Sequence, residues 1–192
     1  MILTHGANSS LKGFLCDIGG TKYRCVKIDG QIWMAENLDW MFANGLQAKY
    51  YDNDSATYGR HGLKYGLLYN MSDFAVLKNS ISSLAPGWEV PTVDDLTYLK
   101  NFVINAWNMP SSLKSRTGWN QLFGNGDNLS GFSAVPSGKY GSNDGFTGLG
   151  NQSCIWLSSQ DTDQPYVKID NWINTYTGNY NLYLAIRLVK NL

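Results

Sequence analysis

The chain has 192 residues, of which 43% are hydrophobic, 14% aromatic and 16% charged, and its formal net charge is zero. This length fits one domain with a sizeable hydrophobic core. Without a basic excess, the composition argues against a nucleic-acid partner and a polybasic membrane anchor, and no apolar run approaches the roughly 18 residues that a membrane-spanning helix needs.

The first predicted unit is a β-meander over residues 11–35. Two dipeptides, Gly19-Gly20 and Asp29-Gly30, divide it, and each supplies the positive φ of a two-residue hairpin turn. The strands that these turns join are expected at residues 14–18, 21–28 and 31–35. Residues 36–66 are rich in turn-forming residues and are expected to form a long loop.

Two amphipathic helices are predicted next. In the first, over residues 71–83, apolar side chains recur at helical spacing, and residues 85–87 (Ala-Pro-Gly) end it. Thr92 is the expected N-cap of the second, and Asp94 and Asp95 stand in its first turn, where the helix dipole favours anions. The stripe expected to face the core consists of Val93, Leu96, Leu99 and Val103.

The carboxyl-terminal half combines an irregular stretch with strands. From Gly124 to Gly150, 17 of 27 residues are Gly, Asn, Asp or Ser, so residues 111–152 are predicted to be mostly loop, with one helical turn at 111–115. Strands are expected at residues 153–158, 165–169, 172–176 and 182–189. In the last strand, alternation predicts that Leu182, Leu184, Ile186 and Leu188 point inward, with Tyr183, Ala185 and Arg187 on the other face.

The chain therefore runs from strands through two helices and a long irregular stretch to strands again. This order predicts an α+β fold with a mainly antiparallel sheet. The sequence contains no internal repeat, which is consistent with a single domain.

Residues with catalytic chemistry are few. Three cysteines, Cys16, Cys25 and Cys154, follow no repeated spacing, so buried free thiols are expected, with a Cys16–Cys25 bridge as the alternative. His5 and His61 stand near no Ser or Cys nucleophile in a recognisable motif. We therefore expect no enzymatic activity and no cofactor.

Oxygen-rich turns leave one metal alternative open. Residues 52–54, 126–128 and 143–144 supply hard oxygen atoms of the kind that Ca²⁺ binds, although no spacing matches a known calcium loop. Turn formation explains these residues, and a structural calcium ion is the alternative.

Eight segments, in order along the chain, resemble the signature of the Fibrobacter succinogenes major paralogous domain. They are residues 31–38, 56–60, 66–70, 84–92, 113–120, 130–136, 155–159 and 186–189. The resemblance implies a C-type-lectin-like fold, which formylglycine-generating enzymes and many adhesins share, over residues 13–192. It also implies a rigid core displaying a variable, loop-rich face, in surface or secreted proteins of Bacteroidetes-type bacteria and in their phages.

Two departures from the family pattern bear on function. Residues 61–65 look inserted between two family segments, and the first residues lack the charged and apolar regions of a signal peptide. If Met1 is the natural start, an extracellular role needs another route, such as assembly into a virus particle. Residues 1–12 are then expected to be a docking segment for a particle or a homo-oligomer.

The carboxyl-terminal third has the composition of a recognition surface. From Asn151 to Tyr183, 18 of 33 residues are Asn, Tyr, Ser, Asp or Thr, a mixture typical of antibody contact loops and suited to sugar rings. The predicted contact residues are Trp156, Tyr166, Asn171, Trp172, Asn174, Tyr176, Asn179, Tyr180, Asn181 and Tyr183. The composition also resembles the variable regions of diversity-generating retroelements, and an ordinary solvated surface is the alternative.

We therefore expect a non-catalytic adhesion domain that recognises a cell-surface glycan or protein receptor, as a phage tail protein or a bacterial surface adhesin. The expected location is the virion or the cell surface, without insertion into a membrane. One alternative is a structural subunit of a virion or surface assembly. The second is an oxidase of the formylglycine-generating type, which needs a reactive cysteine pair in the carboxyl-terminal half, where this chain has only Cys154.

Overall fold

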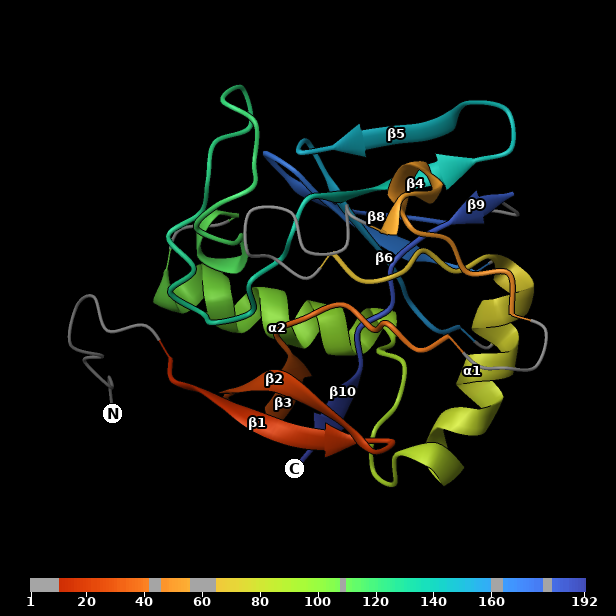
Figure 1. The fold of residues 1–192 in the computed structure, drawn as a ribbon. Helices are drawn as coiled ribbons and strands as arrows, with labels where there is room; N and C mark the ends of the chain where they lie inside the picture. Colours follow the sequence, from red (N-terminus) through yellow and green to blue (C-terminus); the bar gives the residue numbers. More distant parts are fainter. Residues whose placement is uncertain (1–10, 42–45, 56–64, 108–109, 160–163, 178–180) are drawn as a thin grey trace.

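The computed structural model of the chain describes residues 11–41, 46–55, 65–107, 110–159, 164–177 and 181–192. Two β-sheets and two helices dominate this part of the chain (Figure 1). Helix α1 spans Met71–Leu84 and helix α2 spans Val93–Ala106, and 3₁₀ turns lie at Tyr51–Asn53 (η1) and Ser111–Leu113 (η3). The fold is α+β, as predicted. Most of the predicted docking segment, residues 1–10, lies outside the described residues.

The first sheet has four strands in the order β1-β2-β3-β10, and all its neighbours are antiparallel. Its strands are β1 (Gly13–Ile18), β2 (Thr21–Ile28), β3 (Gln31–Met34) and β10 (Val189–Asn191). Gly19, Gly20 and Asp29 adopt positive φ in the two turns of the meander. The predicted meander and its turn residues are therefore confirmed.

The second sheet runs in the order β5-β4-β6-β7-β8, and β9 also pairs with β4. Its strands are β4 (Ser137–Gly141), β5 (Gly145–Leu149), β6 (Ser153–Trp156), β7 (Tyr166–Ile169), β8 (Ile173–Tyr176) and β9 (Leu182–Tyr183). Strand β4 meets β6 in parallel and the other neighbours are antiparallel. The mainly antiparallel arrangement is thus confirmed.

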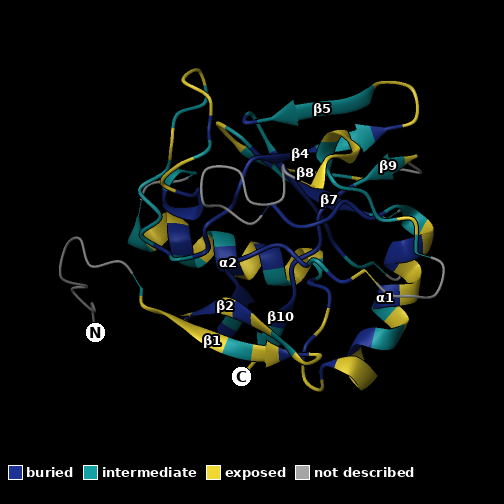
Figure 2. Cartoon of the chain, viewed as in Figure 1, coloured by how far each residue is buried: buried dark blue, intermediate teal, exposed yellow. Residues whose placement is uncertain are grey.

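Each helix supports its own part of the core. Helix α2 lies between the two sheets (Figure 1), where Leu96 and Leu99 pack in one cluster with residues of β2, β3, β6 and β7. Helix α1 flanks the sheets, and Phe74 and Leu77 pack in the other cluster with Trp156. Figure 2 shows buried and exposed residues alternating along both helices. No described helix has the length and apolar character needed to span a bilayer.

Helix α2 begins at the predicted cap. The Asp95 backbone N–H donates to Thr92 Oγ1 at 3.1 Å, and the Thr92 backbone N–H donates to Asp95 Oδ2 at 2.8 Å, which completes a capping box. The prediction that Val93 faces the core is wrong, because this side chain is 37% exposed. At 3.6 residues per turn, Val93 lies about a quarter turn from the centre of the buried stripe.

Most of residues 111–152 are irregular, as predicted, but the prediction missed the β4–β5 hairpin within them. Its strands pair in register, with Tyr140 opposite Phe146 and Gly141 opposite Gly145. Gly138 has a φ of +65°, and a Cβ there would lie 2.5 Å from the Thr147 carbonyl oxygen. A high glycine content here permits close approach of two backbones. The helical turn expected near residue 111 is confirmed as η3.

Residues 182–189 do not form one strand with an outward face, so that prediction is wrong. Strand β9 ends at Tyr183 and β10 begins at Val189, and the segment between them runs from one sheet to the other. Ala185 and Arg187, which alternation assigns to the outer face, are each 0% exposed. Both faces are covered because the segment crosses the interior, where Ala185 forms a bridge with Ile155.

The three cysteines are free, which confirms the prediction of free thiols. Cys25 and Cys154 are buried, and Cys16 is half-buried. The alternative Cys16–Cys25 bridge is not formed.

Candidate functional site

The ten predicted contact residues fall into four groups in the structure. Two are buried (Trp156, Tyr166), four lie on the β7–β8 hairpin (Asn171, Trp172, Asn174, Tyr176), two lie at β9 (Asn181, Tyr183) and two lie outside the described residues (Asn179, Tyr180).

Trp156 and Tyr166 belong to the core, so their prediction as surface contacts is wrong. Trp156 is 0% exposed, its ring centroid lies 5.6 Å from that of Phe74, and its indole N–H donates to the Tyr69 carbonyl at 2.8 Å. Tyr166 is 7% exposed and meets the Trp156 ring at 6.2 Å. Both side chains lie on the face of β6 and β7 that packs against α1.

The other contact residues that the structure describes do not share one face of the sheet. Tyr176 stands opposite Tyr166, and the two rings stack with centroids 5.2 Å apart and planes at 17°. Tyr176 therefore lies on the α1 side. Tyr183 pairs with Tyr140 and packs against the cluster that contains α2. The idea that the whole set forms one surface is therefore wrong.

The β7–β8 hairpin carries one exposed patch. Asn171, Trp172 and Asn174 are exposed, and 72% of the Trp172 surface is accessible. The Trp172 backbone N–H donates to Asp170 Oδ1 at 2.8 Å, which fixes the turn.

Tyr183 belongs to a row of four half-buried rings, which we name the aromatic row: Tyr51, Phe146, Tyr140 and Tyr183. Successive ring centroids are 5.1, 4.8 and 5.1 Å apart, within the range of favourable aromatic pairs. The row leads from η1 across β5 and β4 to β9, and Figure 1 shows these elements gathered at one end of the molecule.

Strand pairing places these rings side by side. Tyr140 stands opposite both Phe146 of β5 and Tyr183 of β9, and directly opposed residues of an antiparallel pair share a face. Tyr51 reaches the row because Gly138 has no side chain: a Cβ there would lie 2.7 Å from Tyr51 Cε2. Burial raises the pKa of Tyr51, so its phenol stays protonated at neutral pH.

A lysine lies over two rings of the row. Lys49 Nζ is 5.4 Å from the ring centroid of Tyr140 and 5.2 Å from that of Tyr183, within the range of cation–π contacts. Two backbone hydrogen bonds of 2.8 and 2.9 Å join Lys49 to Leu68. The ammonium is therefore positioned by the backbone and by the rings together.

Beside the row lies a polar hollow of about 270 Å³. Its lining residues are Asn70, Met71, Ser72, Ser142, Asn181, Leu182 and Tyr183. The Ser142 backbone N–H donates to the Asn181 carbonyl at 3.1 Å, which joins the β4–β5 turn to the segment before β9. The amides and hydroxyls of this lining can donate and accept hydrogen bonds, and none of the lining side chains is charged. The polar hollow thus offers an aromatic wall and neutral hydrogen-bonding groups to one small ligand.

Larger hollows lie elsewhere on the described surface. One of about 540 Å³ includes Trp88 and Glu89, and one of about 380 Å³ includes Trp40. Neither contains a predicted contact residue. Trp88 and Trp40 are only 6% and 8% exposed, so neither hollow offers an open aromatic ring.

The sequence prediction found part of this site. It included Asn181 and Tyr183 but missed Tyr51, Tyr140 and Phe146, because these stand in segments predicted to be loops. The available signal was a pair of short segments, residues 138–141 and 145–148, in which two glycines flank an aromatic residue.

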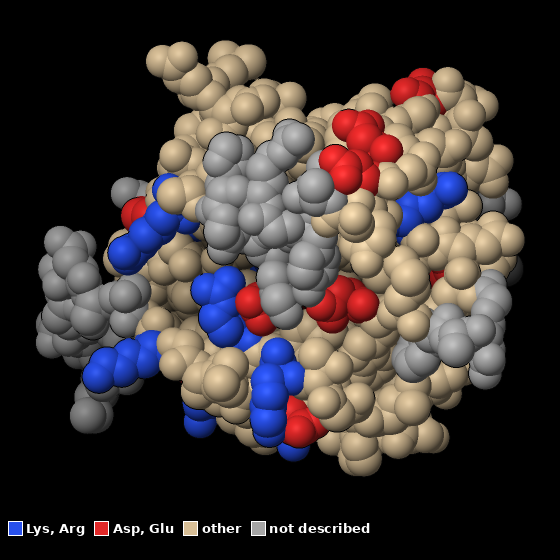
Figure 3. Space-filling model, viewed as in Figure 1, with Lys and Arg blue, Asp and Glu red and all other residues tan. Residues whose placement is uncertain are grey.

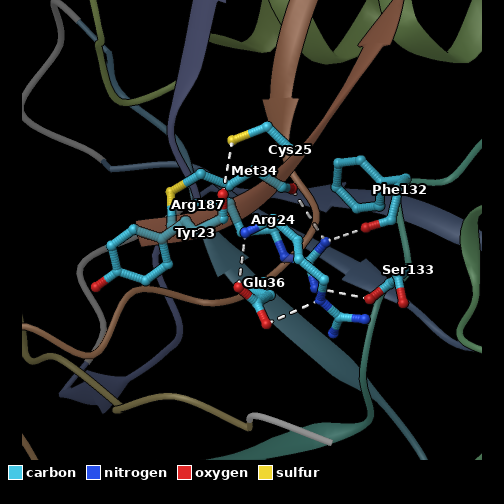
Figure 4. A network of polar contacts seen from close by, with 8 residues as sticks. All are labelled: Tyr23, Arg24, Cys25, Met34, Glu36, Phe132, Ser133 and Arg187. Atoms are coloured by element: carbon cyan, nitrogen blue, oxygen red, sulfur yellow. Dashed lines mark hydrogen bonds and ion pairs between the residues drawn. The ribbon is translucent and has the colours of Figure 1, made fainter. Parts of the chain in front are cut away.

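A buried arginine organises the framework of the fold (Figure 4). Figure 4 shows Arg187 Nη2 donating to the Ser133 carbonyl, at 2.8 Å, and Nη1 donating to the carbonyls of Phe132 and Met34. Arg187 Nε also donates to Asn37 Oδ1, at 2.7 Å. Burial lowers the pKa of Arg187 to about 9, so the guanidinium remains cationic at neutral pH. Three family-like segments, residues 31–38, 130–136 and 186–189, therefore meet in the core.

The thiol considered for oxidase chemistry is poorly placed for it. Cys154 lies in β6 and is 0% exposed, and burial raises its pKa to about 12. Reactive cysteines have the opposite properties, which are a lowered pKa and access to solvent. Within the described ranges, no three His, Cys, Asp or Glu side chains are grouped so that they could hold a metal ion.

Charge does not dominate the surface. On the face in Figure 3, basic and acidic side chains both appear and most of the surface is uncharged. This agrees with the equal totals of 15 basic and 15 acidic residues in the sequence.

Comparison with known families gives one match. The family model described as Fibrobacter succinogenes major domain matches residues 26–190, a range that includes the framework, the aromatic row and the polar hollow. The comparisons with curated proteins and with solved structures gave no match. The C-type-lectin-like fold that the resemblance implies stays a prediction.

Proposed function

The chain belongs to the Fibrobacter succinogenes major domain family, and we propose that it is a non-catalytic recognition domain that binds a cell-surface glycan at the polar hollow and the aromatic row. The observation that carries the proposal is the double role of Tyr183, which lines the hollow and is a ring of the row. An apolar ring surface thus adjoins a group of neutral hydrogen-bonding side chains.

This combination suits the chemistry of sugars. The C–H face of a pyranose packs on an aromatic ring, while its hydroxyls need partners that both donate and accept hydrogen bonds. Asn70 and Asn181 supply amides, and Ser72 and Ser142 supply hydroxyls, within one hollow.

The site is also supported by its rigidity. Ring–ring contacts and cross-strand pairing hold Tyr140 and Tyr183 in place before a ligand arrives. Little side-chain entropy is then lost on binding, which favours affinity.

A protein receptor is the second candidate ligand, and Trp172 favours it. This ring is 72% exposed at a hairpin turn, and tryptophan is enriched among residues that dominate protein–protein affinity. The hairpin patch lies apart from the polar hollow in the sheet order, so the two candidates make different predictions.

The other expectations stay proposals. Four of them rest on the resemblance and the composition. They are location on a virion or cell surface, a diversified carboxyl-terminal surface, a structural calcium ion and assembly as a homo-oligomer. Burial of Cys154 weighs against the oxidase alternative. A structural subunit would bind no glycan.

The test is glycan binding by the full chain. A labelled sample is applied to a glycan array, and hits are measured by calorimetry with Tyr183→Ala, Asn181→Ala and the control Trp172→Ala. We expect Tyr183→Ala to weaken binding at least tenfold, or about 1.4 kcal/mol, and Trp172→Ala to leave it unchanged. Loss of glycan binding in Trp172→Ala alone would assign the site to the β7–β8 hairpin. An array without hits would contradict the proposal.

A further inference from the structure

We infer that the ligand is an acidic sugar and that Lys49 selects it, an inference that rests on the proposed glycan site. The acidic group would be a carboxylate or a sulfate. The ammonium of Lys49 lies over Tyr140 and Tyr183, and Tyr183 is a wall of the polar hollow. Lys49 is not itself one of the residues that line the hollow, but its ammonium lies 5.2 Å from the ring centroid of Tyr183, which is.

A second lysine in the same kind of setting provides a comparison. Lys168 Nζ lies 5.7 Å from the ring centroid of Tyr176 and 2.9 Å from Asp170 Oδ2. The hydrogen bond to Asp170 raises the pKa of Lys168. Lys49, by contrast, forms no ion pair with a carboxylate in the described part of the chain. The fold therefore neutralises the charge of Lys168 and leaves that of Lys49 for a ligand.

Lys49 is suited to either acidic group. Its backbone is fixed by Leu68, and its half-buried side chain limits the loss of freedom on binding. An ammonium is a compact charge with three donors and does not require the planar partner that a guanidinium prefers. A carboxylate and a sulfate are thus both acceptable partners.

One carboxylate lies near the rim of the hollow and opposes an anion. Asp144 Oδ2 lies 3.8 Å from the position of a Cβ on Gly141, and Gly141 pairs with Leu182 of the hollow. If the ligand is anionic, Asp144→Asn should strengthen its binding. If the ligand is neutral, this change should have no effect.

The experiment uses an array with matched neutral, carboxylated and sulfated members of the same sugars, followed by calorimetry at two salt concentrations. We expect an acidic member to bind at least tenfold more tightly than its neutral match, with affinity that falls as salt rises. Lys49→Gln should abolish this preference, Lys49→Arg should retain most of it, and the control Lys168→Gln should leave it unchanged. Thermal melting of each variant verifies that it is folded.

The outcomes separate this inference from the proposed function. Equal binding of neutral and acidic members overturns the inference and leaves the glycan site standing. A preference that survives Lys49→Gln assigns the charge selection to another residue, which also overturns it. No binding to any glycan overturns the inference and the proposed function together. The preferred member identifies the acidic group as carboxylate or sulfate.

Discussion

Arg187 is a buried cation whose hydrogen-bond partners are neutral oxygen atoms. Its ring contact with Phe132, at 4.6 Å from the centroid, adds a cation–π interaction. The carboxylate of Glu36 is hydrogen bonded by the backbone and side chain of Arg24, at 2.8 and 2.9 Å. A buried charge is tolerated only when its hydrogen-bond donors have partners. The partners of Arg187 lie near residue 34 and at residues 132–133, so its hydrogen bonds join three distant segments of the chain.

Replacing Arg187 tests this framework. Arg187→Met leaves the carbonyls of Phe132 and Ser133 and the amide oxygen of Asn37 without this donor, so we expect unfolding free energy to fall by at least about 3 kcal/mol. Urea unfolding followed by circular dichroism measures the loss. A change below about 1 kcal/mol would mean that these oxygens find other partners.

Cys154 predicts a pH dependence of stability. Its thiol has an ordinary pKa of 9.0, which burial raises to about 12 in the folded chain. The folded state keeps the proton above pH 9 while the unfolded state releases it, so the contribution of Cys154 is complete below pH 9 and declines as pH rises toward 12.

The measurement compares the wild type with Cys154→Ala under reducing conditions. The difference between their unfolding free energies should shrink by about 1.4 kcal/mol between pH 8 and pH 10. A difference that stays constant over this range would show that the thiol ionises equally in both states.

Trp156 and Arg187 show which properties of a single residue can be predicted from the sequence and which cannot. Composition assigns Trp156 to the ligand contacts by residue type alone, and alternation places Arg187 on the face opposite Leu184 and Ile186. Neither composition nor alternation indicates that other parts of the chain cover these two side chains. That information comes from long-range packing, here with α1 and with residues 132–133.

At the scale of elements, the helices were the most predictable part. The period of apolar residues gives α2, and Thr92 with Asp95 marks its start to the residue. The β4–β5 hairpin was missed because its sequence is as rich in glycine as a loop. Close backbone approach distinguishes Gly138 from a loop glycine, because a Cβ there would lie 2.5 Å from the Thr147 carbonyl oxygen, and this contact depends on the pairing of β4 with β5.

Two glycines of this hairpin provide a matched test. Gly138 and Gly145 have nearly the same φ, +65° and +67°, but a Cβ on Gly138 would meet Thr147 and Tyr51, and one on Gly145 would meet nothing within 4 Å. Both alanine variants carry backbone strain, and only Gly138→Ala adds a clash.

We expect Gly138→Ala to lower the unfolding free energy by about 2 kcal/mol more than Gly145→Ala. It should also weaken glycan binding, because Tyr51 at the end of the aromatic row is displaced. Thermal unfolding and calorimetry give the two values. Equal effects of the two substitutions would show that Gly138 is needed only for its positive φ.

At the scale of the molecule, the framework and the proposed binding surface are separate. Family-like segments meet around Arg187 inside the protein, whereas the polar hollow is formed by the start of α1, the β4–β5 turn and β9. Asn70 is the exception, because it ends the family-like segment 66–70 and caps helix α1 through a hydrogen bond from the Asp73 backbone N–H. The other residues of the hollow lie outside the family-like segments, so we expect them to tolerate substitution better than Asn70.

On the proposed function, ligand binds where the polar hollow meets the aromatic row. The most direct test is a titration of the ¹⁵N-labelled chain with its best array ligand, followed by amide chemical shifts. We expect the largest changes at residues 49–51, 70–72, 140–146 and 181–183. Changes confined to residues 170–176 of the β7–β8 hairpin, with those four segments unaffected, would contradict the proposed function.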